Sequence, residues 1–210
     1  MKNKNTKLII YIFLLFVIMC SLFLLYVLEY NVKTYDKNLY AEIYKEFNEL
    51  EQLEELSTSI DITNTSSNSN PVIYKTNARG NMYRVIATIN IPKLNLNYPI
   101  INETTEEYLK ISPTKLYGAE PNQIGNLCIV GHNYEDDTLF SNLDQLTNGD
   151  IVKIKNTSGK TEKYSVYNSY IVNRNDVSCL DQNTNGKTEI TLITCTNKNN
   201  KMLIVKCEKI

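Results

Sequence analysis

Several residue types are scarce in this 210-residue chain, and each scarcity limits the chemistry that the chain can carry out. The sequence has no Trp, one His and, among 22 basic residues, three arginines. Because there is a single His, zinc sites built from several histidines are excluded, and any histidine-dependent mechanism must use His132. A formal net charge of -1 provides no basic field for a polyanion, so nucleic acid is not expected as a partner.

A long apolar run lies near the N-terminus, at residues 8–28, and it contains no charged residue. At about 1.5 Å per residue this run is long enough to cross a hydrocarbon core of about 30 Å, and it predicts a transmembrane helix. Lysines concentrate in residues 1–7, so the positive-inside rule predicts a cytoplasmic tail and places the rest of the chain outside the cell. A cleaved secretory signal is the alternative, but no small-x-small site follows the run, which favours an uncleaved single-pass anchor.

Two segments of different composition follow this run. Residues 29–56 carry apolar groups at helical spacing among acidic positions, which predicts a juxtamembrane amphipathic helix. We interpret it as a spacer, with a docking or regulatory helix as the alternative. Residues 57–83 include a Ser/Thr/Asn tract with little apolar surface, which predicts a flexible linker. Residues 84–210 remain as one domain of ordinary size.

The predicted domain alternates short β-rich runs with turn residues. The runs are residues 84–92, 96–101, 126–132, 150–156, 162–172, 187–195 and 201–209. Two short helical segments are expected at residues 103–110 and 137–146. Seven strand-like runs in one domain predict a mainly β fold, either a barrel or a sandwich.

Four of the five cysteines lie outside the apolar run, where disulfides are chemically allowed and their connectivity is open. Cys128 and Cys207 lie within apolar strand-like runs, so we expect both to be small buried hydrophobes. Cys195 ends a β-rich run and precedes the polar loop TNKNNK. A strand terminus near the surface is where a nucleophilic thiol is accessible, so Cys195 is the candidate nucleophile.

His132 also follows an apolar run, LCIVG, and opens a polar loop. An imidazole beside a thiol can hold the thiol proton and so activate the sulfur for attack on an acyl group. His132 and Cys195 are far apart in the sequence, so their pairing is a hypothesis and coincidence is the alternative.

Five segments around these residues resemble, in order and spacing, the bacterial sortases, which are cysteine transpeptidases of Gram-positive cell surfaces. The segments are IPKLNLNYPI, LCIVGHN, TLFSNLDQLTNGDIVKI, TEITLITCT and MLIVKC. The resemblance begins near Arg84 and runs to the last residue. It is closest to class D-like sortases of low-GC Firmicutes, with an unclassified clostridial or Firmicute type as the alternative. It implies a closed eight-stranded sortase-type β-barrel with short helices, and no cofactor.

The resemblance also implies a reaction. Cys195 would attack the carbonyl after the Thr of an LPXTG-like sorting signal and form an acyl-thioester. His132 would act as general acid for the leaving amine and as general base for the incoming one, supplied by a peptidoglycan precursor or a pilin lysine. The expected partners are therefore proteins that carry a sorting signal, with the catalytic domain outside the cell at the membrane.

One position departs from the sortase pattern. Sortases carry an Arg on the last strand just before its L-I-V run, and this chain has Met202 there. Strand residues alternate faces, so if Met202 points into the site, Lys201 points away. Thr194, Lys201 and Arg174 remain candidates for substrate or oxyanion support. Loss of an oxyanion donor costs on the order of 100- to 1,000-fold in rate, so the alternative is a weakened or inactive sortase-fold protein that acts as a surface binding or scaffolding module.

No metal site is expected from the sequence. Acidic residues that could bind calcium are interpreted as solvated loop residues instead. They are Glu103, Glu106, Glu107, Glu135, Asp136 and Asp137.

Overall fold

The computed structural model describes residues 10–31, 34, 73–76, 82–134, 137–196 and 201–210. The chain divides into two compact units, residues 1–39 and residues 40–210, and each is described by itself. Most of the predicted amphipathic helix at 29–56 and the first part of the predicted linker, up to residue 72, lie outside the described residues.

The first unit contains the helix Ile10–Asn31, whose apolar side chains are exposed. Within the described residues it is the one helix long and apolar enough to cross a membrane. Its polar Ser21 donates a hydrogen bond of 2.8 Å to the Ile18 carbonyl of the same helix. This bond satisfies the hydroxyl internally, as an apolar environment requires. The apolar helix predicted at residues 8–28 is therefore present from residue 10, where the described residues begin, and it continues to Asn31.

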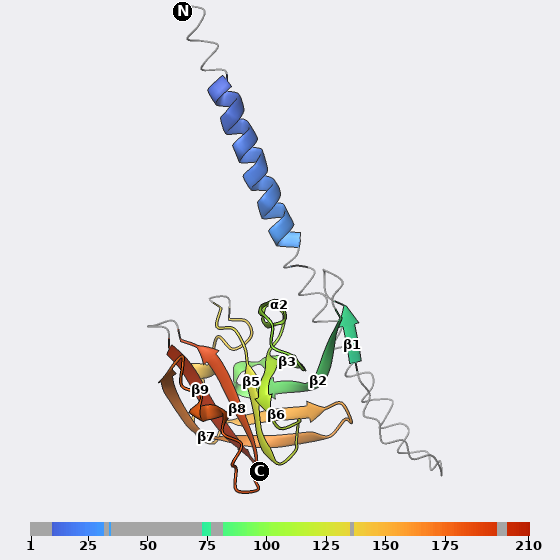
Figure 1. The fold of residues 1–210 in the computed structure, drawn as a ribbon, viewed down its shortest axis with the longest axis vertical. Coiled ribbons are helices and arrows are strands. Elements are labelled where there is room, and N and C mark those ends of the chain that lie inside the picture. Colours follow the sequence, from blue (N-terminus) through green and yellow to red (C-terminus); the bar gives the residue numbers. More distant parts are fainter. Residues whose placement is uncertain (1–9, 32–33, 35–72, 77–81, 135–136, 197–200) are drawn as a thin grey trace, which may run out of the picture. The chain divides into compact units, whose positions relative to one another are not determined.

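The second unit is a closed barrel of eight strands (Figure 1). Its strands are β2 Met82–Ile91, β3 Leu96–Ile101, β4 Thr114–Gly118, β5 Gly125–Val130, β6 Ile151–Asn156, β7 Thr161–Asn173, β8 Thr188–Cys195 and β9 Lys201–Lys209. They follow the order β2-β3-β4-β5-β8-β9-β7-β6, and β6 pairs back with β2 to close the ring. The β3–β4 and β5–β8 pairs are parallel, whereas the other pairs are antiparallel, so the barrel is mixed.

A further strand, β1 Ile73–Thr76, pairs antiparallel with the start of β2. Both β1 and the first residues of β2 fall within the segment 57–83 that the sequence predicts to be a linker. That prediction is wrong for these residues. An added edge strand is held by backbone hydrogen bonds along its neighbour, so it needs little apolar content of its own.

The helical predictions have opposite outcomes. Helix α2 Glu106–Leu109 is present, and its N-cap Thr105 accepts a hydrogen bond of 3.1 Å from the Tyr108 amide. The helix predicted at residues 137–146 is wrong, because only the 3-10 turn η2 Leu143–Gln145 forms there. Asp137 and Leu139 adopt positive φ angles, which an α-helix of L-residues does not tolerate. The apolar spacing that suggested a helix instead buries Phe140, Leu143 and Leu146 in the core.

Side chains of strands β5, β8 and β9 alternate between the barrel interior and its outer face. Interior residues such as Leu127, Leu192 and Val205 join a core to which seven of the eight strands contribute. Outward residues form a second cluster, which we call the outer apolar cluster. Its buried members are Cys128, Cys179, Ile193 and Ile204, with Val130, Tyr170, Val172, Leu180 and Met202 packed partly buried against them. Cys179 and Leu180 belong to the 3-10 turn η3 Ser178–Leu180, which therefore lies over the outer faces of these strands.

Candidate active site

The parallel strands β5 and β8 end at the same level of the barrel. Val130 at the end of β5 pairs with Ile193 of β8, and the Gly131 amide then donates to the Ile193 carbonyl at 3.1 Å. His132 follows Val130 by two residues, and Cys195 follows Ile193 by two. Because neighbouring strands lie about 4.8 Å apart, His132 and Cys195 lie at or just beyond the ends of two adjacent strands. The pairing hypothesized from the sequence thus has a backbone basis.

Two side-chain hydrogen bonds join the ends of these strands. The Thr194 hydroxyl donates to the Gly131 carbonyl at 2.8 Å, in a position where Thr194 is buried. The Asn133 amide donates to the Cys195 carbonyl, also at 2.8 Å. Thr194, which precedes Cys195, and Asn133, which follows His132, therefore each bond across to the segment that carries the other candidate catalytic residue. The role of Asn133 was missed at the sequence level, since a short amide after a Gly-His pair has many other uses.

Cys195 is the exposed cysteine of the barrel, whereas Cys128, Cys179 and Cys207 are buried free thiols. Burial raises the pKa of Cys128 to about 11 and also raises the pKa of Cys179 and of Cys207. These three thiols are therefore protonated at neutral pH, and a thiol reacts as its thiolate. The predicted burial of Cys128 and Cys207 is confirmed.

His132 is half-buried and stacks against Tyr134, with ring centroids 4.9 Å apart and an interplanar angle of 33°. Burial, followed by the positive charge of Lys110, lowers the pKa of His132, while Glu106 acts in the opposite direction. Both charged residues belong to α2 or its C-cap. The net lowering favours the neutral imidazole, which can accept a proton from a thiol.

Met202 lies directly across from Cys195 in the antiparallel pairing of β8 with β9. Residues directly opposite in such a pair point to the same face of the sheet. Two residues further along β9, Ile204 belongs to the outer apolar cluster, whereas Leu203 points into the core. Lys201 therefore lies on the opposite face from Met202, as expected from alternation. The chain thus presents a thioether beside Cys195 on this face.

Arg174 lies farther away in the sheet. It follows Asn173, the last residue of β7, and β9 separates β7 from β8. Two strand spacings, about 10 Å, therefore lie between the backbone of this segment and that of Cys195. Arg174 is exposed and comes two residues after Val172, which pairs with Met202 and belongs to the outer apolar cluster.

Within the described residues, no group of three or more His, Cys, Asp or Glu side chains converges to hold a metal ion. Two of the six acidic candidates, Glu135 and Asp136, lie outside those residues.

A closed mixed barrel with a cysteine and a histidine at the ends of two parallel neighbouring strands defines a candidate thiol enzyme. The sequence model of the sortase domain matches residues 89–210, and the chain belongs to the sortase family. The mainly β eight-stranded fold expected from the resemblance is confirmed.

Individual relatives are similar over different lengths. Sortase A of Bacillus anthracis is 30% identical over 120 residues, which is 57% of this chain and 56% of that protein. The match therefore spans little more than half of that relative. The Clostridium perfringens sortase D5 transpeptidase structure has a TM-score of 0.59 and 26% identity, covering 84% of this chain and 99% of that one. Sortase C-1 of Actinomyces oris has a TM-score of 0.53 and 29% identity, covering 59% of this chain and 73% of that one. These relatives belong to classes A, D and C, so the likeness identifies the family and not the class.

Proposed function

We propose that this protein is a membrane-anchored transpeptidase that cleaves an LPXTG-like sorting signal and transfers the freed carboxyl end to an amine. The observation that carries the proposal is the placement of Cys195 and His132 after paired residues of adjacent parallel strands. Membership of the sortase family supports the reaction type.

The first step forms an acyl-enzyme. The Cys195 thiol gives its proton to the His132 imidazole, and its sulfur attacks the carbonyl carbon of the scissile peptide bond. The C–N bond then breaks, the proton on His132 passes to the leaving amine, and the acyl group remains on Cys195 as a thioester. His132 ends this step neutral again, which suits its lowered pKa.

The second step regenerates the enzyme. An amino group, from a peptidoglycan precursor or a pilin lysine, attacks the thioester carbonyl while His132 accepts its proton. A new C–N bond forms as the C–S bond breaks, and the proton returns to the Cys195 sulfur. Hydrolysis by water is the competing fate of the same thioester.

The outer apolar cluster supplies a contact for the signal's apolar residues beside Cys195. Its partly buried members Met202 of β9 and Val172 of β7 lie in one row with the nucleophile, and Val130 of β5 lies beside Ile193, two residues before Cys195. Their remaining exposed apolar surface is removed from water when an apolar side chain packs on it, a gain of about 25 cal/mol per Å². We propose that the residues of the signal that precede the scissile bond lie along this row.

The helix Ile10–Asn31 is proposed as the anchor of a single-pass protein. Lysines in residues 1–7 support a cytoplasmic N-terminus, and the barrel would then work on the outer side of the membrane. That side is where surface proteins and the cell wall are found.

Arg174 is proposed as the cationic support that the last strand lacks. Met202 has no hydrogen to donate to an oxyanion, and Lys201 lies on the opposite face of β9. Arg174 follows the strand next to β9, past the residue opposite Met202. A long guanidinium side chain from this position can approach a peptide lying over Met202, where its planar fork suits a carbonyl or carboxylate.

A second candidate function follows from Met202 itself. With an apolar residue opposite Cys195, the fold could bind sorting-signal peptides without turning them over, as a surface binding or scaffolding module. Peptide binding that persists in Cys195→Ala, with no turnover by the unchanged protein, would identify this function.

The test uses the full-length chain in detergent micelles, a panel of LPXTG-like peptides and an amine such as triglycine. We expect a cleaved peptide, an amine-linked product and a thioester adduct on Cys195 detectable by intact-mass spectrometry. Cys195→Ala and His132→Ala should abolish turnover, whereas Cys207→Ala, at a buried thiol inside the barrel core, should retain it. Absence of product and adduct from a folded protein would refute the enzymatic proposal.

A further inference from the structure

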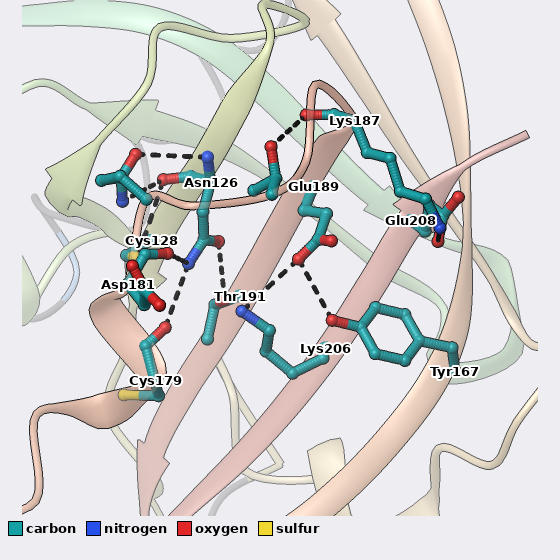
Figure 2. Close-up of polar contacts among 12 residues, drawn as sticks. Asn126, Cys128, Tyr167, Cys179, Asp181, Lys187, Glu189, Thr191, Lys206 and Glu208 are labelled. Atoms are coloured by element: carbon teal, nitrogen blue, oxygen red, sulfur yellow. Dashed lines mark hydrogen bonds and ion pairs between the residues drawn. The ribbon is translucent and has the colours of Figure 1, made fainter.

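Asn126 of β5 is a fully buried polar residue whose hydrogen-bonding groups are all satisfied (Figure 2). Its side-chain amide donates to the Cys179 and Asp181 carbonyls, each at 3.0 Å. Its side-chain oxygen accepts a hydrogen bond of 2.7 Å from the Thr191 hydroxyl of β8. A single side chain thus joins the segment between β7 and β8 to two strands of the barrel.

Gln182 completes the connection from the loop side. Its side-chain oxygen accepts a hydrogen bond of 3.2 Å from the backbone N–H of Asn126, and its side-chain nitrogen donates one of 3.0 Å to the backbone carbonyl of Asn126. Gly118 of β4 makes room for this contact, because a Cβ there would lie 2.0 Å from the Asn126 carbonyl oxygen. Four hydrogen bonds therefore join residues 179–182 to Asn126.

The strands beneath are fixed to one another by charged and polar pairs (Figure 2). Glu189 of β8 accepts a hydrogen bond of 3.1 Å from the Tyr167 hydroxyl of β7 and pairs with Lys206 of β9 at 3.6 Å. Lys187 and Glu208 add a further ion pair at 2.8 Å. Asn126 therefore attaches the loop to a connected sheet.

The position of η3 on this sheet bears on the candidate active site. Its residues Cys179 and Leu180 pack in the outer apolar cluster with Ile193 and Ile204, two residues away from Cys195 and Met202 in the same strands. A shift of η3 changes the apolar surface next to Cys195. The hydrogen bonds within the loop, such as Ser178 to Asp176 and Asn183 to Asp181, are local and do not fix it to the sheet.

We propose that Asn126 is a positioning residue that sets peptide recognition at Cys195 by holding the η3 turn against the outer apolar cluster. The inference rests on the proposed function, and it assigns substrate affinity to a residue that does not touch the reacting atoms. Asn126 acts through the turn, because its buried side chain bonds to the Cys179 and Asp181 carbonyls and not to the reacting residues.

The test is Asn126→Asp in the full-length chain, because the carboxylate keeps the shape of the side chain and loses the two donations to the Cys179 and Asp181 carbonyls. KM for the best sorting peptide should rise about tenfold, with kcat nearly unchanged. The rate at which iodoacetamide alkylates Cys195 should stay at the unchanged protein's value. Thr191→Val is the matched control, since it removes the bond to the side-chain oxygen of Asn126 and leaves both donations to the loop in place.

A second variant covers the case in which Asn126→Asp does not fold. Gln182→Glu at a half-buried loop position removes the donation to the Asn126 carbonyl and should raise KM in the same direction. Hydrogen exchange of residues 176–187 should accelerate in both variants, and this readout needs no catalytic activity. An unchanged KM together with unchanged exchange in a folded variant would overturn the proposal, whereas absence of turnover by the unchanged protein would count against the proposed function alone.

Discussion

Cys195 and Met202 are direct cross-strand partners at the end of the β8–β9 pair where the chain passes from β8 to β9, so the candidate nucleophile has a thioether beside it on the outer face of the barrel. A thioether is a weak acceptor and has no proton to donate, so Met202 cannot stabilise a developing oxyanion. In the proposed enzyme, stabilisation of the oxyanion must therefore come from a group other than Met202.

Met202→Arg tests that dependence directly. A guanidinium at this position would face the same side as Cys195 and add a charge-assisted hydrogen bond, contributing about 1.5–3 kcal/mol to transition-state stabilisation. We expect kcat/KM for a sorting peptide to rise about 10- to 100-fold, measured by product formation with the amine present. Met202→Leu is the control and should leave the rate near its starting value. Equal rates for the Arg and Leu variants would show that the position does not contact the transition state.

Arg174→Ala tests the proposed replacement. Removing the guanidinium should lower kcat/KM by about 100-fold, the usual effect of losing one oxyanion donor. Arg174→Lys should recover part of the loss, because the charge remains and the planar fork does not. Met202→Arg combined with Arg174→Ala should restore activity if the two positions serve one function. A fully active Arg174→Ala enzyme would remove Arg174 from the mechanism.

The pH dependence of the reaction reports the environment of His132. Burial and Lys110 lower the pKa of His132, so the acidic limb of the pH–rate profile should have its midpoint below the usual histidine value of about 6.5. Lys110→Gln removes a positive charge that disfavours the imidazolium, so the pKa of His132 rises and the limb moves to higher pH. Glu106→Gln should move it to lower pH. Lys160→Gln, in the turn between β6 and β7, is the matched control and should leave the profile in place. If none of these substitutions moved the acidic limb, the limb would report the titration of a group other than His132.

Gly131→Ala should weaken both the fold and the site. An added Cβ would lie 2.8 Å from two ring carbons of Phe140, which is fully buried in the barrel core. Overpacking of this kind costs about 1–3 kcal/mol in the free energy of unfolding and would displace the adjacent His132. Thermal unfolding followed by circular dichroism measures the first effect, and peptide turnover measures the second. Combining Gly131→Ala with Phe140→Leu should recover part of the stability and part of the turnover. A lack of recovery would show that the strain does not come from the contact with Phe140.

Much of the barrel could be predicted from sequence because its strands are rich in β-branched residues and end at recognisable turns. Residues 96–101 and 201–209 form strands with the expected bounds. Strand β4 was missed because TKLYG is short and places only Thr114 in a buried position. The prediction of a helix at residues 137–146 is wrong, because apolar residues spaced three apart, as Phe140, Leu143 and Leu146 are, can also be buried by a series of turns.

The two candidate catalytic residues could be predicted from the sequence, whereas the hydrogen bonds that hold their segments in place could not. Strand ends are visible in sequence, so Cys195 and His132 could be named, whereas their approach depends on the parallel pairing of β5 with β8. The bonds from Asn133 to Cys195 and from Asn126 to Cys179 join residues more than fifty positions apart. Asparagine is common in this chain, and its composition does not show which amides are buried and fully bonded.

The parallel pairing of β5 with β8 also affects how the protein folds. Parallel neighbours require a long crossover, and here the connection includes η2, β6, β7 and η3. Chain entropy must be lost over that whole connection before the pairing returns any stability, which slows folding. His132 and Cys195 therefore come together only after this crossover is in place. A partly folded chain would carry an exposed thiol without its histidine, so acquisition of transferase chemistry would be a late event in maturation.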